Sequence, residues 1–207
     1  MLKKLLFATL LLSSTTYAMH EFELNVNNKD LDLHLGLDMG QFNDTIEPDS
    51  FIVKARLMKG DSEHARFPDK EGTNEEQDTN ILGEVGFVAQ SSSAMAPGLM
   101  MGMGVKLTYT PLEKQSIFAM PIGVVSDYTL PFDSFIPLHI GGQFYYAPEV
   151  LAFEQSTRYM EYQANFDVEL MERGLLTMGY RGIDTPTKDK SSTYYNRSYF
   201  VGFKFKF

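Results

Sequence analysis

The sequence predicts an all-β protein, an antiparallel up-and-down transmembrane β-barrel of about ten strands, with eight as the alternative count. Three observations predict it. Apolar residues recur at every second position over long segments, which is the period of a strand rather than of a helix. Many segments reach the roughly 9 to 11 residues of a tilted membrane strand, whereas globular strands usually have about 5 or 6. Polar segments typical of loops separate them.

Residues 1–18 have the pattern of a secretory signal peptide. Lys3 and Lys4 form its basic start, residues 5–12 are apolar, and residues 16–18 (TYA) form a small-residue cleavage site. The apolar part is too short for a membrane anchor, which needs about 20 residues. We expect cleavage after Ala18, which leaves residues 19–207 as one outer-membrane barrel.

Residues 30–40 (DLDLHLGLDMG) show the alternation most clearly, with Leu and Met on one face and Asp, His and Gly on the other. Comparable segments predict strands at residues 20–28, 30–41, 50–59, 79–89, 99–110, 115–126, 134–146, 157–171, 174–183 and 194–207. A soluble periplasmic β-sandwich would also alternate, and it remains the structural alternative.

The connections between these segments predict an orientation. Barrels of this class keep short turns on the periplasmic side and longer loops outside. With both termini periplasmic, residues 59–78 and 184–193 become outside loops, and residues 172–174 become a periplasmic turn. The periplasmic links at residues 42–49 and 90–98 are longer than this pattern favours.

Composition argues against several kinds of function. The formal net charge is −9, and removal of Lys3 and Lys4 with the leader makes the mature chain more negative still. Nucleic acid is therefore not an expected partner, because its binding requires a cationic face. There is no Cys, and the four His are isolated in the sequence, so we expect no metal site and no cofactor.

The predicted inward face carries both signs of charge. Its charged residues are Lys54, Arg56, Lys106, Arg181, Lys204 and Lys206 together with Asp30, Asp32, Asp38, Glu84, Glu161, Asp167 and Glu169. In so narrow a barrel, charges must pair or reach water. We expect a structural ion network made of Lys54, Arg56, Glu84, Lys106, Glu161, Asp167, Glu169 and Arg181. Small inward residues such as Gly102 and Gly104 leave a conducting lumen as the alternative.

Three segments of the second half carry a family resemblance. They are residues 142–153 (GQFYYAPEVLAF), 159–162 (YMEY) and 179–182 (GYRG). The chain resembles the YfaZ family of outer-membrane proteins, and the first segment is the most specific part of the likeness. The resemblance implies an outer-membrane location and a barrel architecture. It supplies no catalytic residue.

Pro148 interrupts the seventh strand, because proline cannot donate to a strand ladder. We therefore expect the following segment to form an outside loop whose apolar residues fold over or into the lumen. The predicted lumen cap consists of Tyr145, Tyr146, Pro148, Glu149 and Phe153.

The sequence ends on alternating aromatic residues, Phe203, Phe205 and Phe207. This ending is similar to the signal that barrel-assembly machinery recognises, so we expect that machinery as a partner during biogenesis. Outer-membrane lipid and lipopolysaccharide are the other expected partners of a monomer. The expected role is structural, or that of a narrow, porin-like channel for small solutes. A barrel enzyme acting at the outer mouth is the functional alternative.

Overall fold

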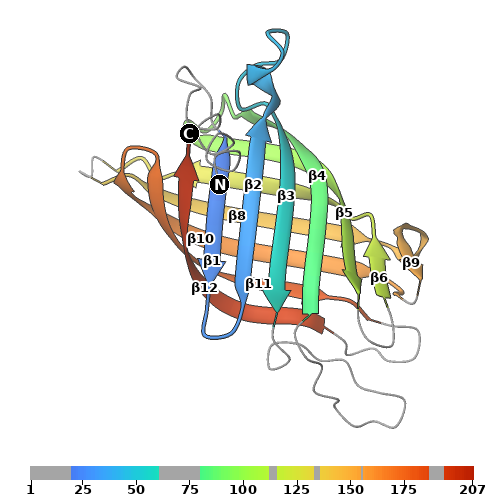
Figure 1. The fold of residues 1–207 in the computed structure, drawn as a ribbon. Helices are drawn as coiled ribbons and strands as arrows, with labels where there is room; N and C mark the ends of the chain where they lie inside the picture. Colours follow the sequence, from blue (N-terminus) through green and yellow to red (C-terminus); the bar gives the residue numbers. More distant parts are fainter. Residues whose placement is uncertain (1–19, 61–79, 112–115, 133–135, 155, 187–193) are drawn as a thin grey trace, which may run out of the picture.

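The chain forms one closed antiparallel β-barrel (Figure 1). The structure, a computed structural model, describes residues 20–60, 80–111, 116–132, 136–154, 156–186 and 194–207. The sheet closes because β1 pairs with β12 and β4 pairs with β5. Among the described residues, no helix is long and apolar enough to cross a membrane.

Ten strands make up the wall, each antiparallel to its neighbours. In order around the barrel they are β1 (Glu21–Val26), β2 (Leu31–Asp38), β3 (Phe51–Gly60), β4 (Asn80–Ser92), β5 (Leu99–Pro111), β7 (Ile122–Thr129), β8 (Leu138–Ala147), β10 (Tyr159–Met171), β11 (Gly174–Asp184) and β12 (Tyr194–Lys206). The prediction of about ten antiparallel strands is confirmed.

The sequence predicts one continuous strand at residues 115–126, and this prediction is wrong. The structure divides it into β6 (Ser116–Ala119) and β7, which pair with successive parts of β5 on either side of Pro121. Pro121 has no N–H to donate, which explains the break. A short strand, β9 (Ala152–Glu154), pairs with β6 and extends the sheet beside the barrel (Figure 1).

The strands define two ends of the barrel. One end holds residues 20 and 207, the 3-10 turn η1 (Met39–Gln41), and the links at residues 93–98 and 172–173. We call it the terminal end. The opposite end, which we call the loop end, holds the turn at residues 27–30 between β1 and β2 and the segment at residues 148–151 after β8. The leader and its cleavage site, most of the predicted loop at 59–78 and most of that at 184–193 lie outside the described residues.

The barrel is polar inside and apolar outside. Asp32, Thr108 and Asn196 are completely buried, whereas the outward side chains Leu57, Val85 and Met103 are more than half exposed. This distribution is the reverse of a water-soluble protein and matches a barrel whose outer wall contacts hydrocarbon. A single closed sheet with charged residues inside is not a sandwich of two sheets around an apolar core.

The outward face of β4 provides a first test. Val85 lies near the middle of this strand and is 52 % exposed. Val85→Arg should destabilise the barrel in a bilayer by about 2 to 4 kcal/mol, because an arginine at the midplane leaves water for hydrocarbon. Urea unfolding in lipid vesicles measures the difference, with Val85→Ile as the control. Equal stability of the two variants would show that Val85 does not face lipid.

Candidate functional site

The inward side chains form three layers along the barrel. On β3, Lys54, Arg56 and Met58 point inward, and each belongs to one layer, in this order from the terminal end to the loop end. Lys54 lines a polar cavity, Arg56 is the centre of an ion network, and Met58 belongs to a buried apolar cluster. The layers follow from the strand period, because every second residue of a tilted strand points into the lumen.

Arg56 connects three strands with its five guanidinium N–H groups. Its Nε and Nη2 donate to the two carboxylate oxygens of Asp32 on β2 at 2.8 and 2.9 Å. Its Nη1 donates to Glu84 on β4 at 3.1 Å and, across the lumen, to Glu161 on β10 at 2.8 Å. The side chain is 4 % exposed. This fork geometry is specific to arginine, since a lysine cannot bind a carboxylate with two parallel hydrogen bonds.

Lys106 on β5 provides a second cation for the same acids. Its Nζ lies 3.0 Å from the Glu84 carboxylate and also donates to Glu161. The hydroxyl group of Tyr159 lies 3.0 Å from a Glu84 oxygen and 2.7 Å from a Glu161 oxygen, so its single proton can be donated to either carboxylate. Thr108 donates to Glu84 at 2.9 Å. Several donors therefore surround each of these two buried carboxylates, which offsets the cost of removing them from water.

Arg181 on β11 extends the network to the other wall. It donates to Asp32 from Nη1 and to Asn196 from Nε at 3.2 Å, and its Nη2 lies 3.6 Å from Asp30. Asn196 in turn donates to Asp30 at 2.9 Å. Seven side chains carry the charge of this layer, which we call the ion network: Arg56, Lys106, Arg181, Asp30, Asp32, Glu84 and Glu161.

The structure divides the predicted network into separate groups. It brings Arg56, Glu84, Lys106, Glu161 and Arg181 together, as expected. Asp167 lies nearer the terminal end, where it pairs with Lys204 at 2.9 Å. A carboxylate oxygen of Glu169 lies 3.8 Å from Nε2 of His139, and the Glu169 side chain is 31 % exposed. Lys54 lines the polar cavity described below. The expectation of one network of eight residues is therefore wrong for Lys54, Asp167 and Glu169, because their strand positions place them below the layer of Arg56.

A buried apolar cluster lies inside the barrel on the loop side of the ion network. Its members are Met58, Leu82, Ile117, Ala119, Ala147, Tyr159, Ile183 and Tyr195, with Leu151 packed against them. Leu151 ends the short 3-10 turn η3 (Glu149–Leu151), and its carbonyl accepts a hydrogen bond from the N–H of Met120 at 2.9 Å. The loop after β8 is thereby attached to the break between β6 and β7.

The predicted lumen cap is correct only in part. Tyr145 points inward from β8 and is 4 % exposed, with Lys106 Nζ 4.5 Å above its ring. Tyr146 is the next residue of the same strand and points outward at 41 % exposed. Phe153 is also outward, on β9, where its ring packs against Phe118 at 5.3 Å. Pro148 and Glu149 begin the turn η3 that leads to Leu151.

The predicted assembly signal lies at the seam of the barrel. Phe207 forms two backbone hydrogen bonds with His20, at 2.9 and 2.8 Å, and its ring is stacked on Phe205. Phe203 is outward and 36 % exposed.

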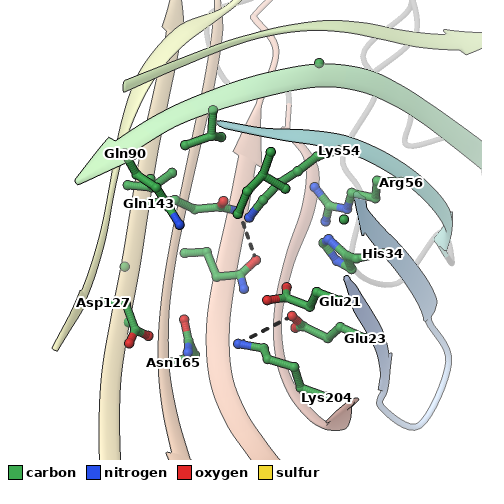
Figure 2. A pocket seen from close by; sticks show the side chains of 18 of the residues that line it. Glu21, Glu23, His34, Lys54, Arg56, Gln90, Asp127, Gln143, Asn165 and Lys204 are labelled. Carbon is green, nitrogen blue, oxygen red and sulfur yellow. Dashed lines mark hydrogen bonds and ion pairs between the residues drawn. The ribbon is translucent and has the colours of Figure 1, made fainter. Parts of the chain in front are cut away.

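A cavity of about 190 Å³ lies below the ion network, toward the terminal end (Figure 2). Charged walls come from β1, β3, β7 and β12, and amides come from β4, β8 and β10. Gly86 makes room beside Lys106, since a Cβ at this position would lie 2.5 Å from the Lys106 Cβ. The inward side chain of Asp127 is 43 % exposed, whereas those of the ion network are 11 % exposed or less. The cavity therefore communicates with solvent at the terminal end.

Two buried tyrosines were not among the predicted site residues. Tyr159 lies on the inward face of its strand, but its role depends on glutamates brought close by barrel closure. Tyr195 lies at a β-bulge opposite Ile183 and Asp184 and is only 1 % exposed. The regular alternation predicts it on the outward face, and no sequence signal marks the bulge.

The three described histidines lie apart from one another in the barrel. His20 and His139 lie at the terminal end, and His34 lies 3.0 Å from Asp32 in the interior. His64 lies outside the described residues. Within the described part of the chain, no group of three or more His, Cys, Asp and Glu side chains has the geometry of a metal site.

Comparison with known proteins gives structural likeness only. No family model matches the chain, and no curated protein matches it. The β-domain of the Bordetella autotransporter BrkA is 10 % identical with a TM-score of 0.44, over 92 % of this chain and 98 % of that one. The outer-membrane channel DcaP of Acinetobacter baumannii is 12 % identical with a TM-score of 0.37, over 89 % of this chain and 54 % of that one.

OmpT of Vibrio cholerae, in its outer-membrane expressed form, is 14 % identical with a TM-score of 0.35, over 86 % of this chain and 56 % of that one. The chain spans a little over half of the length of DcaP and of this OmpT. At these low scores the likeness carries no argument about function, and the barrel is established by the strand pairing of this chain itself.

The ion network provides a second test. Arg56→Met should destabilise the barrel by about 3 to 5 kcal/mol, because it leaves buried carboxylates without their central cation. The control is Arg197→Met, which breaks an ion pair with Asp184 whose arginine is 45 % exposed. That change should cost about 0 to 1 kcal/mol. Urea unfolding in the same vesicles measures both, and equal losses would mean that the Arg56 network contributes no more than a surface pair.

Proposed function

We propose that this chain is an integral barrel protein of the outer membrane of a Gram-negative-type envelope, with a lumen that is closed at rest. The observation that carries the proposal is the double seal in the lumen. Fully or nearly fully buried side chains of the ion network cross from wall to wall, and the apolar cluster covers them on the loop side. A structural role is the function that this closed interior supports best.

The outer-membrane location is supported by the physical character of the wall. Closed barrels with outward apolar and inward polar residues are the β-structures that satisfy every backbone hydrogen bond in a bilayer. The likeness of residues 142–153 to the YfaZ family is consistent with this location, and membership of that family is part of the proposal. Lipid and lipopolysaccharide are the proposed surroundings of a monomer that barrel-assembly machinery inserts.

A narrow small-solute channel is the second candidate, and the polar cavity at the terminal end favours it. The seal consists of side chains and a short turn rather than a separate domain, so it contains few groups that would have to move. An enzyme at the outer mouth has less support, because the described histidines lie at the terminal end or inside the barrel.

Conductance in planar bilayers tests the closed lumen. The unmodified protein should conduct little, and replacing residues 148–151 with a Gly/Ser linker should leave conductance low, because the ion network still crosses the lumen. Adding Lys106→Ala and Glu161→Ala to the linker variant should raise conductance, since this pair bridges two walls without a change of net charge. Steady conductance of the unmodified protein would establish an open channel and contradict the seal.

The assembly signal is tested by deletion of Phe207. The deletion should lower the yield of protein in the outer-membrane fraction, where the folded barrel is recognised by its heat-modifiable gel migration. Because the deletion also removes two backbone hydrogen bonds to His20, refolding of the purified variant into detergent is the control. A normal outer-membrane yield would exclude Phe207 as part of the signal.

A further inference from the structure

The cavity below the ion network is large enough for a small organic molecule. Its volume is about 190 Å³. For comparison, an apolar cavity of about 150 Å³ in another protein holds benzene. The walls here are polar, so the occupant that matches them is a polar solute of about six to eight non-hydrogen atoms or a group of waters.

Acidic and basic side chains line this cavity in equal numbers among the described residues. The acidic ones are Glu21, Glu23, Glu84, Asp127 and Asp167, and the basic ones, apart from two histidines, are Lys54, Arg56, Lys106, Lys204 and Lys206. These walls therefore offer no excess of either charge to a solute that carries a net charge.

The charges nearest the ion network and the seam are held in ion pairs. Arg56 and Lys106 bind the carboxylates of the ion network. Lys204 lies 2.9 Å from Asp167 and 3.6 Å from Glu23. These pairs join different strands, so a charged solute that displaced one partner would weaken the wall itself.

The charges nearer the opening also have partners. Glu21 interacts electrostatically with three lysines of the wall, among them Lys54 and Lys206. A carboxylate oxygen of Asp127 lies 3.7 Å from Nδ1 of His139, and Asp127 also interacts electrostatically with Lys206. A carboxylate or an ammonium group of a solute would therefore compete with an existing partner or remain without one, which is unfavourable in a lumen of low dielectric constant.

The uncharged groups of the wall, by contrast, have unused hydrogen-bonding capacity. Gln90, Gln143 and Asn165 reach the cavity from β4, β8 and β10 (Figure 2). The Gln90 side chain forms no hydrogen bond with the described part of the chain. Gln143 donates to Glu161 at 3.4 Å and to Gln163 at 3.3 Å, and both bonds are longer than an ordinary N–H···O bond.

Hydroxyl groups match these walls. A hydroxyl donates and accepts through one atom, so it can bind either end of an amide. It can also donate to the remaining lone pairs of a carboxylate such as that of Asp127, whose side chain is 43 % exposed, without removing the charge that the carboxylate already faces. We propose that the cavity binds a neutral polyol of the size of glycerol or erythritol, with its hydroxyl groups on Gln90, Gln143 and Asp127.

Saturation-transfer NMR on the full barrel in lipid nanodiscs tests the site, with empty nanodiscs as the blank. The probes are glycerol and erythritol, and the matched molecules are glycerate and 3-amino-1,2-propanediol, which carry one charge each. At least one polyol should bind, about tenfold or more tightly than either charged molecule, because an added charge has no free partner in the cavity. If neither polyol binds saturably, or if a charged molecule binds as tightly, the proposal is wrong.

A variant that fills the cavity locates the bound solute. Val125 on β7 lines the cavity beside Gly102, where an added Cβ would lie 3.0 Å from Cγ2 of Val125. Val125→Phe should occupy the space and weaken polyol binding at least about tenfold. The control is Val124→Phe at the next residue, which is 50 % exposed on the outward face and should leave binding unchanged. Heat-modifiable migration verifies folding of both variants.

Gln90→Leu tests the amide wall without removing a hydrogen bond inside the described structure. It should weaken polyol binding about threefold to tenfold, the effect of one neutral hydrogen bond. Unchanged binding in folded Val125→Phe and Gln90→Leu would place the solute elsewhere and overturn the assignment. The nanodisc measurement does not depend on transport or on cellular location, so its failure is distinguishable from a failure of the outer-membrane assignment, which membrane fractionation decides.

Discussion

The structure depends on the way in which Arg56 is neutralised inside the barrel. A single guanidinium group binds carboxylates on β2, β4 and β10, so it ties neighbouring strands together and also spans the lumen. The cost of removing these charges from water is offset only because every carboxylate in the layer has several donors. The ion network thus separates the apolar cluster on the loop side from the cavity on the terminal side.

Much of the fold could be predicted because strand period is local. Alternation in residues 30–40 or 159–170 assigns each side chain to a face without knowledge of its neighbours, and Arg56, Glu84 and Glu161 all lie inside as expected. The contacts between inward residues could not be predicted from this local pattern. Arg56 and Glu161 are far apart in sequence, and only closure of the barrel with its particular register brings them to 2.8 Å.

The failures of prediction have physical reasons of the same kind. Pro121 breaks a strand that alternation alone extends through it, and the bulge beside Asp184 turns Tyr195 from the outer face to the interior. The sequence predicts that the apolar residues of the loop after β8 fold over or into the lumen. Leu151 does pack against the buried cluster, but Phe153 joins a strand outside, because β6 provides backbone partners there.

The seam between β1 and β12 has a consequence for how the chain acquires its shape. The register runs from Glu21 opposite Lys206 to Val26 opposite Val201, and the backbone bonds of His20 and Phe207 extend it. The ring therefore closes by joining its first and final strands. Until both are in place, the sheet has two unpaired edges, and neither Arg181 nor Asn196 can reach Asp30 and Asp32. The bonds of Arg181 and Asn196 to Asp30 and Asp32 therefore require the closed ring, whereas Arg56 meets Asp32 and Glu84 on its own neighbouring strands.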